Sequence, residues 1–269
     1  MRIPTNSLDD KVALITGAGS GIGRATAKLM AHCGCRVALL SRTESELEKL
    51  ADEITRTQDD PERVLVLPAD VTDEGAMREA VERIEAKWGR LDILFANAGV
   101  NGKWAPIEEL SPDDWDRTMQ INLKGTFLSI RACVDPMRRA GGGSIVITSS
   151  VNGTRMFSNS GASAYAASKA AQLALGRMLA VELADDRIRV NTICPGAIET
   201  EIDDNTNRTD IEDLHVPVQF PEGDIPLTGG QPGTAGQVAE TVWFLASDAS
   251  SHTTGAEIFI DGAQSLLVG

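Results

Sequence analysis

The sequence of 269 residues predicts an α/β fold, a doubly wound parallel β-sheet of about seven strands with helices on both faces. Two observations lead to this prediction. Short apolar runs alternate with segments of helical pattern along the whole chain, as expected for buried strands joined by crossover helices. No Pro/Gly-rich linker divides the chain into two cores, so we expect one domain over residues 1–269.

The expected strands are apolar runs that are too short for helices. They cover residues 12–15, 37–40, 64–67, 91–95, 144–148, 189–193 and 257–260. The expected helices cover residues 24–31, a segment from 44 onward, 74–88, about 163–183 and 234–247, with helical material over 113–137 that is interrupted near Asn122 and Gly125. Thr43 and Glu46 have the spacing of a capping box at the start of the second helix.

The chain is acidic, with a formal net charge of −14 and a pI near 4.7. Nucleic acids and anionic membranes both need a basic face, so neither is expected as a partner. Residues 1–10 have no apolar core of signal-peptide length, and no apolar run approaches a membrane span, so we expect a cytoplasmic protein. Cys33 and Cys35 lie beside His32 but have no second ligand cluster, so no metal site is expected.

A glycine-rich turn joins the first expected strand to the first expected helix. It contains Gly17, Gly19, Gly21 and Gly23, four glycines in seven residues. Residues without a Cβ let a pyrophosphate approach the backbone, and the new helix offers unpaired N–H groups. The spacing differs from G-x-G-x-x-G, but the order of strand, turn and helix predicts a dinucleotide-binding site. A tight turn without a ligand is the alternative.

The end of the second expected strand is where the adenosine ribose of a dinucleotide would lie. An acid there binds the 2′-hydroxyl, whereas an arginine accommodates a 2′-phosphate. Here Ser41 is followed by Arg42, and the first acid is Glu44. The sequence therefore favours NADP(H), with NAD(H) possible and a solvated loop cation as the alternative reading of Arg42.

Tyr165 and Lys169 are four residues apart in an expected helix, and Tyr165 is the only tyrosine in the chain. This spacing puts both side chains on one helix face. A nearby ammonium group favours the phenolate, so we expect Lys169 to lower the pKa of Tyr165 into the range of general acid–base catalysis. An isolated pair of this kind is more often a packed aromatic beside a surface lysine.

Six motifs occur in order along the chain. They are Thr16-Gly17-Ala18-Gly19-Ser20-Gly21-Ile22-Gly23, Asn97-Ala98-Gly99, Asn122, Ser150, Tyr165-x-x-x-Lys169 and Pro195-Gly196. With these motifs the chain resembles the short-chain dehydrogenase/reductase family from Lys11 to about Ser265. The resemblance implies a Rossmann-like fold and an NAD(P)(H)-dependent oxidoreductase that interconverts a carbonyl and a secondary alcohol. Ala96 stands where the family often has asparagine, a tolerated variant.

The resemblance also implies site residues. The cofactor would contact Gly17, Gly19, Ser20, Gly21, Ile22, Gly23, Ser41, Arg42, Asp70, Val71, Asn97, Ala98, Gly99, Tyr165, Lys169, Pro195, Gly196, Ile198 and Thr200. Tyr165 would exchange the proton, Lys169 would lower its pKa and hold the nicotinamide ribose, and Asn122 would position a relay water. Ser150 would hydrogen-bond the substrate, with Ser149 and Ser163 as rivals because the segment before Tyr165 is longer than usual.

The resemblance implies that residues 200–233 form a substrate lid, with an acidic surface loop as the compatible alternative. The acids make anionic substrates less attractive, unless they face solvent. Trp104, Met156 and Phe157 would line the substrate pocket and suggest an apolar or ring-shaped substrate, although packing aromatics would look the same. A 3-oxoacyl-carrier-protein reductase is the alternative within enzymes, followed by sugar or steroid dehydrogenases. A non-catalytic dinucleotide-binding regulator is the alternative outside them. The resemblance implies a homotetramer, or a homodimer, built on the helices around residues 123–137 and 163–183.

Overall fold

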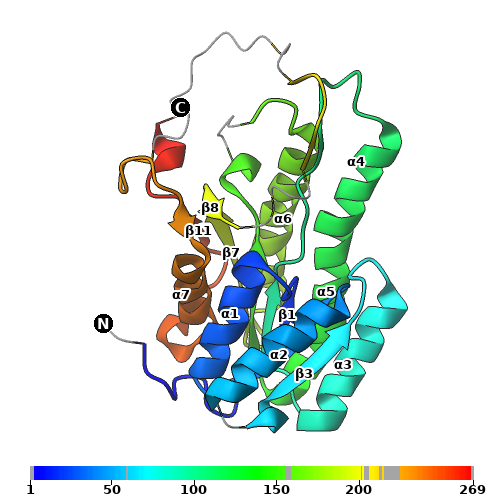
Figure 1. The fold of residues 1–269 in the computed structure, drawn as a ribbon. Helices are drawn as coiled ribbons and strands as arrows, with labels where there is room; N and C mark the ends of the chain where they lie inside the picture. Colours follow the sequence, from blue (N-terminus) through cyan, green and yellow to red (C-terminus); the bar gives the residue numbers. More distant parts are fainter. Residues whose placement is uncertain are drawn as a thin grey trace.

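The structure is a computed structural model that describes residues 3–58, 60–154, 159–200, 202, 206–211, 214 and 225–267. At its centre is a seven-stranded sheet in the order β11-β7-β6-β4-β1-β2-β3 (Figure 1), and every neighbouring pair is parallel. The strands are β1 (Val12–Thr16), β2 (Arg36–Ser41), β3 (Val64–Pro68), β4 (Ile93–Ala96), β6 (Gly143–Thr148), β7 (Ile188–Pro195) and β11 (Glu257–Ile260). The predicted doubly wound α/β fold is confirmed.

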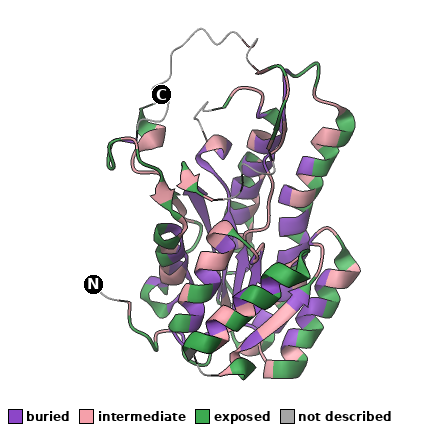
Figure 2. Cartoon of the chain, viewed as in Figure 1, coloured by how far each residue is buried: buried purple, intermediate pink, exposed green. Residues whose placement is uncertain are grey.

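Helices cover both faces of the sheet. They are α1 (Gly21–His32), α2 (Glu44–Gln58), α3 (Glu74–Trp88), α4 (Pro112–Met119), α5 (Gly125–Ala140), α6 (Ser163–Glu182) and α7 (Ala235–Ala246). Alternate β1 residues enter two cores, because successive side chains of a strand point to opposite faces. Ala13 and Ile15 pack with α1, α2 and α7, whereas Val12 and Leu14 pack with α3, α5 and α6. Figure 2 shows the buried residues gathered in the strands and on the helix faces that meet the sheet.

The chain reverses its direction across the sheet at β1. β2 and β3 follow on one side of β1, and β4, β6, β7 and β11 then fill the other side. In such sheets ligands bind outside the carboxyl ends of the strands at this switch point. The carboxyl ends of β1 and β4 therefore mark the edge where a site is expected.

A π-helical turn over Gln120–Lys124 separates α4 from α5. The predicted interruption near Asn122 and Gly125 is therefore confirmed. A π-turn leaves part of the helical hydrogen-bond ladder open for other partners. This irregular turn faces the site described below.

Two short parallel ladders were not predicted. β5 (Gly102–Trp104) pairs with β9 (Thr206–Arg208), and β8 (Ile198–Glu199) pairs with β10 (Gly233–Thr234). Strands of two or three residues carry no periodic signal, so they are visible only in the folded chain. Both ladders fasten the described parts of the predicted lid segment to the rest of the molecule.

The predicted capping box at Thr43 and Glu46 is wrong. The amide of Glu46 donates to the Thr43 carbonyl at 3.2 Å, and the Glu46 carboxylate lies against Gly19 of the glycine turn instead of returning to Thr43. The positive end of α1 lies at this turn and attracts a carboxylate. In the part of the chain that the structure describes, no helix has the length and apolarity that a membrane crossing requires.

Candidate active site

The glycine turn between β1 and α1 is packed too tightly for side chains. Gly17 and Gly21 adopt φ values of 65° and 50°, which favour glycine. A Cβ on Gly23 would collide with the carbonyl of Gly17. The turn also exposes the start of α1, where the Ser20 side chain makes no capping hydrogen bond to described residues and the first turn has no acid. This is a site that a pyrophosphate fits.

The loop after β4 is tied to the same turn. The Thr16 hydroxyl accepts from the amides of Asn97 (3.0 Å) and Ala98 (3.1 Å). The Asn97 side chain donates to the Thr16 carbonyl at 3.2 Å and accepts from the Thr148 hydroxyl at 3.2 Å. These bonds hold the ends of β1, β4 and β6 together, so the central strands meet the glycine turn at one rigid edge.

Tyr165 is buried near the start of α6, and Ser150, which follows β6, is close enough to act on its pKa. Burial raises the pKa of Tyr165, and Ser150 opposes that rise. The expected lowering of the tyrosine pKa by Lys169 is therefore not found in the ligand-free chain, because desolvation has the larger effect. The Ser149 hydroxyl donates to the Lys169 carbonyl at 2.8 Å, and Ser163 is exposed, so Ser150 is the serine that meets the tyrosine.

Lys169 is buried beneath Tyr165 with its ammonium group 5.5 Å from the ring centre. Its Nζ donates to the Thr148 carbonyl at 2.9 Å, and no carboxylate lies within ion-pair distance among the described residues. Burial without a counter-ion lowers the pKa of Lys169 to about 8. At neutral pH the lysine therefore stays mostly protonated and keeps donors that no described residue uses.

Asn122 lies in the π-turn and braces the loop after β4 against α6. Its Oδ1 accepts from the Val100 amide (2.8 Å), and its Nδ2 donates to the Val100 carbonyl (2.9 Å) and to the Ser168 hydroxyl (3.0 Å). At Gly99 an added Cβ would lie 3.2 Å from Asn122 Oδ1 and 3.5 Å from Lys169 Nζ. Gly99 therefore leaves the space in which the asparagine and the lysine approach each other.

Gln172 belongs to this cluster and was missed in the sequence. Its Nε2 donates to the Asn122 carbonyl at 2.9 Å and to the Thr126 hydroxyl at 2.7 Å, which links α6 to the open part of the π-turn. Its Oε1 is buried and has no partner among the described residues. A signal was present, because Gln172 lies seven residues after Tyr165 and therefore on the same face of the helix.

The predicted contacts to the adenosine half of the cofactor lie at the ends of β2 and β3. The Ser41 hydroxyl is buried without a partner among the described residues, and Arg42 is exposed with no ion pair to them. The Asp70 carboxylate accepts from the Thr72 amide (2.9 Å) and hydroxyl (2.8 Å), so it shapes its own turn. Val71 is buried against Gly125 of α5.

The segment after β7 brings the last predicted cofactor contacts to this edge. Gly196 packs against Asp261 and Gln264, where a Cβ would have no room. Ile198 is held in the β8–β10 ladder, and the Thr200 hydroxyl accepts from the Ile202 amide at 3.5 Å. β7 ends at Pro195, so residues 196–200 follow the carboxyl end of this strand.

Trp104, a predicted pocket residue, lies beside the tyrosine. It is buried, packs with Tyr165 and Ala162, and also contacts Ile211. Its Nε1 donates to the Asn101 carbonyl at 3.3 Å, and the Arg208 guanidinium lies 5.1 Å from the ring centre. The other two predicted pocket residues, Met156 and Phe157, lie outside the described residues.

Comparisons with known proteins agree with this geometry. A family model described as Enoyl-(Acyl carrier protein) reductase matches residues 17–263. Levodione reductase from Leifsonia aquatica is 38% identical over 263 residues, which are 97% of each chain. The crystal structure of a 3-ketoacyl-ACP reductase from Sinorhizobium meliloti is 52% identical with a TM-score of 0.90, covering 95% of this chain and 99% of that chain.

A further solved relative carries a cofactor. It is a 3-ketoacyl-(acyl-carrier-protein) reductase from Brucella melitensis complexed with NADH, 31% identical with a TM-score of 0.84, covering 96% of this chain and all of that chain. The glycine cradle, the exposed start of α1 and the unpartnered Ser41 hydroxyl fit such a dinucleotide. This chain belongs to the short-chain dehydrogenase/reductase family of NAD(P)-dependent oxidoreductases, which interconvert carbonyl groups and alcohols.

Proposed function

We propose that Tyr165 is the general acid and base of this oxidoreductase and that NADP(H) is the preferred cofactor. The observation that carries the proposal is the convergence of the buried Tyr165 with Ser150, which acts on its pKa, and with the Lys169 ammonium group, 5.5 Å from the ring centre. Hydride transfer to a carbonyl needs a proton donor and a hydrogen bond where negative charge develops. Both groups converge here, at the edge that carries the glycine turn.

Each residue has a distinct role in this scheme. The bound nicotinamide ring supplies or accepts the hydride. Burial raises the pKa of Tyr165, which keeps its phenol protonated at neutral pH and ready to donate to the substrate oxygen during carbonyl reduction. Ser150 holds that oxygen, and Lys169 stabilises the phenolate that remains. Asn122 fixes the loop after β4 to α6 through its hydrogen bonds with Val100 and Ser168.

The test is Tyr165→Phe, with Ser163→Ala as the matched control because it removes an exposed hydroxyl from the same helix. The phenylalanine variant should lose turnover by about 10²- to 10⁴-fold, the usual contribution of a general acid. Its thermal shift with NADPH should stay close to that of the wild type. Retained turnover in this variant would refute the acid–base role.

The preference for NADP(H) rests on Arg42, whose exposed guanidinium has no ion pair within the described chain and follows β2 directly. A planar guanidinium can bind a phosphate with two parallel hydrogen bonds. A ligand at about 100 times its Kd stabilises a protein by about 2.7 kcal/mol, so parallel thermal shifts with NADPH and NADH measure the preference. Arg42→Asp should reverse it, and a wild type that already favours NADH would defeat this part of the proposal.

A 3-oxoacyl thioester is the second candidate substrate, and the observation that favours it is the 52% identity to the Sinorhizobium meliloti protein. The buried Trp104 favours a compact apolar or ring-shaped ketone instead, because its ring already packs on Tyr165. Steady-state rates with cyclic ketones and with a 3-oxoacyl thioester, followed at the nicotinamide absorbance, decide between the two. The larger kcat/KM identifies the substrate class.

We also propose that residues 200–233 cover the substrate within one domain. The support is the β5–β9 ladder, the bond from the Thr209 amide to the Trp104 carbonyl (2.9 Å) and the contact of Ile211 with Trp104. A substrate bound beneath this segment should slow its proteolysis. Equal cleavage rates with and without cofactor and substrate would contradict a lid.

A homotetramer, or a homodimer, in the cytoplasm completes the proposal. Phe127 on α5 and Met178 and Val181 on α6 expose 46%, 70% and 80% of their surfaces, more than a solvent-facing helix needs. The four cysteines are unpaired, as expected in a reducing compartment. Light scattering and cell fractionation test these two points.

A further inference from the structure

The Glu46 carboxylate lies in an unusual place. Glu46 is in the first turn of α2, yet its Oε2 comes within 2.5 Å of the position that a Cβ would take on Gly19. The Ser41 hydroxyl lies within 3.2 Å of the same position. A carboxylate and a hydroxyl therefore flank the middle of the glycine turn, on the side where β2 ends.

The buried Ser41 hydroxyl indicates that a ligand binds over Gly19. It is buried and has no partner among the described residues, which is a cost that folded proteins rarely accept without a ligand or water. Glu46 gives up a capping position to lie beside it. Together the two side chains present an acceptor and a donor to a group that would fill the space over Gly19.

A ribose with free 2′- and 3′-hydroxyls matches these groups. The hydroxyls can donate to the carboxylate and accept from Ser41. A 2′-phosphate does not match, since a carboxylate at short range repels it even in high dielectric. Arg42, which follows Ser41 directly in the sequence, has the opposite preference.

We propose that Glu46 is the residue that keeps NAD(H) usable by this chain, by accepting a hydrogen bond from the adenosine ribose and opposing the 2′-phosphate that Arg42 attracts. The proposal rests on the proposed function only in requiring that a nicotinamide dinucleotide binds at the glycine turn. Cofactor choice is then a balance between two side chains of opposite charge, Arg42 directly after β2 and Glu46 in the first turn of α2.

The experiment measures binding rather than turnover. NADH and NADPH are titrated separately by fluorescence into wild type, Glu46→Gln and Glu48→Gln, the last being an exposed glutamate of the same helix. Glu46→Gln keeps the shape and removes the charge. It should tighten NADPH binding about tenfold and weaken NADH binding about tenfold, the size expected for one charge at close range. Glu48→Gln should match the wild type.

Equal changes for both dinucleotides, or none, would overturn the role of Glu46 and leave the acid–base role of Tyr165 untouched. If the wild type binds neither dinucleotide, the proposed function fails as well. Ser41→Ala gives an independent measurement. It should leave the melting temperature of the ligand-free chain unchanged or higher, because it removes an unpartnered hydroxyl, yet reduce the NADH-induced shift. An NADH-induced shift equal to the wild type's would overturn the part assigned to Ser41.

Discussion

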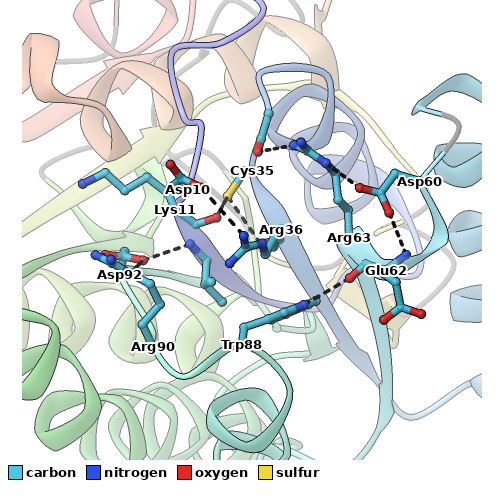
Figure 3. A network of polar contacts seen from close by, with 12 residues as sticks. Asp10, Lys11, Cys35, Arg36, Asp60, Glu62, Arg63, Trp88, Arg90 and Asp92 are labelled. Carbon is cyan, nitrogen blue, oxygen red and sulfur yellow. Dashed lines mark hydrogen bonds and ion pairs between the residues drawn. The ribbon is translucent and has the colours of Figure 1, made fainter.

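The two edges of the sheet differ in how completely their buried polar groups are paired. At the carboxyl edge Lys169 has no counter-ion in the described chain, and Ser41 and Gln172 each keep a buried oxygen without a partner there. At the amino edge Asp92 accepts from the Val12 amide (3.0 Å) and from Nε and Nη2 of Arg90 (2.9 and 2.6 Å). Figure 3 shows this second edge, where each labelled group meets another within the network.

Further hydrogen bonds at the amino edge involve Arg63 and Trp88. Arg63 donates to the Gly34 carbonyl (2.6 Å) and to Asp60 (3.1 Å), and Trp88 donates to the Glu62 carbonyl (3.1 Å). Satisfied groups of this kind stabilise the fold, whereas unfilled ones cost stability and leave capacity for a ligand. The difference between the edges therefore separates residues kept for structure from residues kept for chemistry.

The largest effect is expected from Lys169→Met. Turnover should fall by about 10²- to 10⁴-fold, because the phenolate loses its neighbouring cation. The free energy of unfolding of the ligand-free chain should not fall at neutral pH, since a buried cation without a counter-ion is replaced by an apolar side chain. Rates and denaturant unfolding of wild type, this variant and Lys49→Met, an exposed control, measure both quantities. A large loss of stability would contradict the contrast between the edges.

Asp92→Ala should do the reverse at the amino edge. Removing this buried carboxylate leaves the Val12 amide and the Arg90 guanidinium without their partner, which should cost about 3 kcal/mol of unfolding free energy. The kcat/KM of the folded protein should change less than about twofold, because the residue is remote from the glycine turn. Urea unfolding and initial rates measure these two quantities. A variant that is stable but inactive would contradict the difference between the two edges.

The pH dependence of stability should report Lys169 specifically. Burial lowers the pKa of Lys169 from 10.5 to about 8 in the folded chain. Above pH 8 the unfolded chain therefore keeps a proton that the folded chain has released, and the free energy of unfolding rises with pH. Between pH 8 and about pH 9.5 the wild type should gain about 2 kcal/mol relative to Lys169→Met. A constant difference would show that the ammonium group is not desolvated.

The fold was largely predictable because its signals are local. Buried parallel strands are continuous apolar runs, and the predicted 74–88 and 257–260 coincide with α3 and β11. Other boundaries moved by one to three residues, since the ends of elements depend on hydrogen bonds to neighbours, as in β7, which extends to Pro195. The β5–β9 ladder joins residues about a hundred positions apart, a pairing for which three-residue strands carry no pattern.

The site was predictable in its motifs but less so in its energetics. Tyr165, Lys169 and Ser150 were found by spacing and resemblance, and the structure brings them together. The sign of the tyrosine pKa shift was missed, because desolvation depends on burial by the whole fold. Gln172 was missed because its role depends on its contacts with Asn122 and Thr126, which come from a distant part of the chain.

The smallest effect is expected from Glu62→Gln, which tests whether the amino edge owes its stability to charge or to buried hydrogen bonds. The Glu62 carboxylate binds Lys87 at 2.8 Å but is 82% exposed, and its backbone carbonyl, which a glutamine keeps, is what holds Trp88. Solvent screens such a pair, so the free energy of unfolding should change by less than about 0.5 kcal/mol. Urea unfolding of Glu62→Gln and of Asp92→Ala, measured side by side, compares the two contributions within one network. If Glu62→Gln cost as much as Asp92→Ala, surface charge rather than buried hydrogen bonding would be what stabilises this edge.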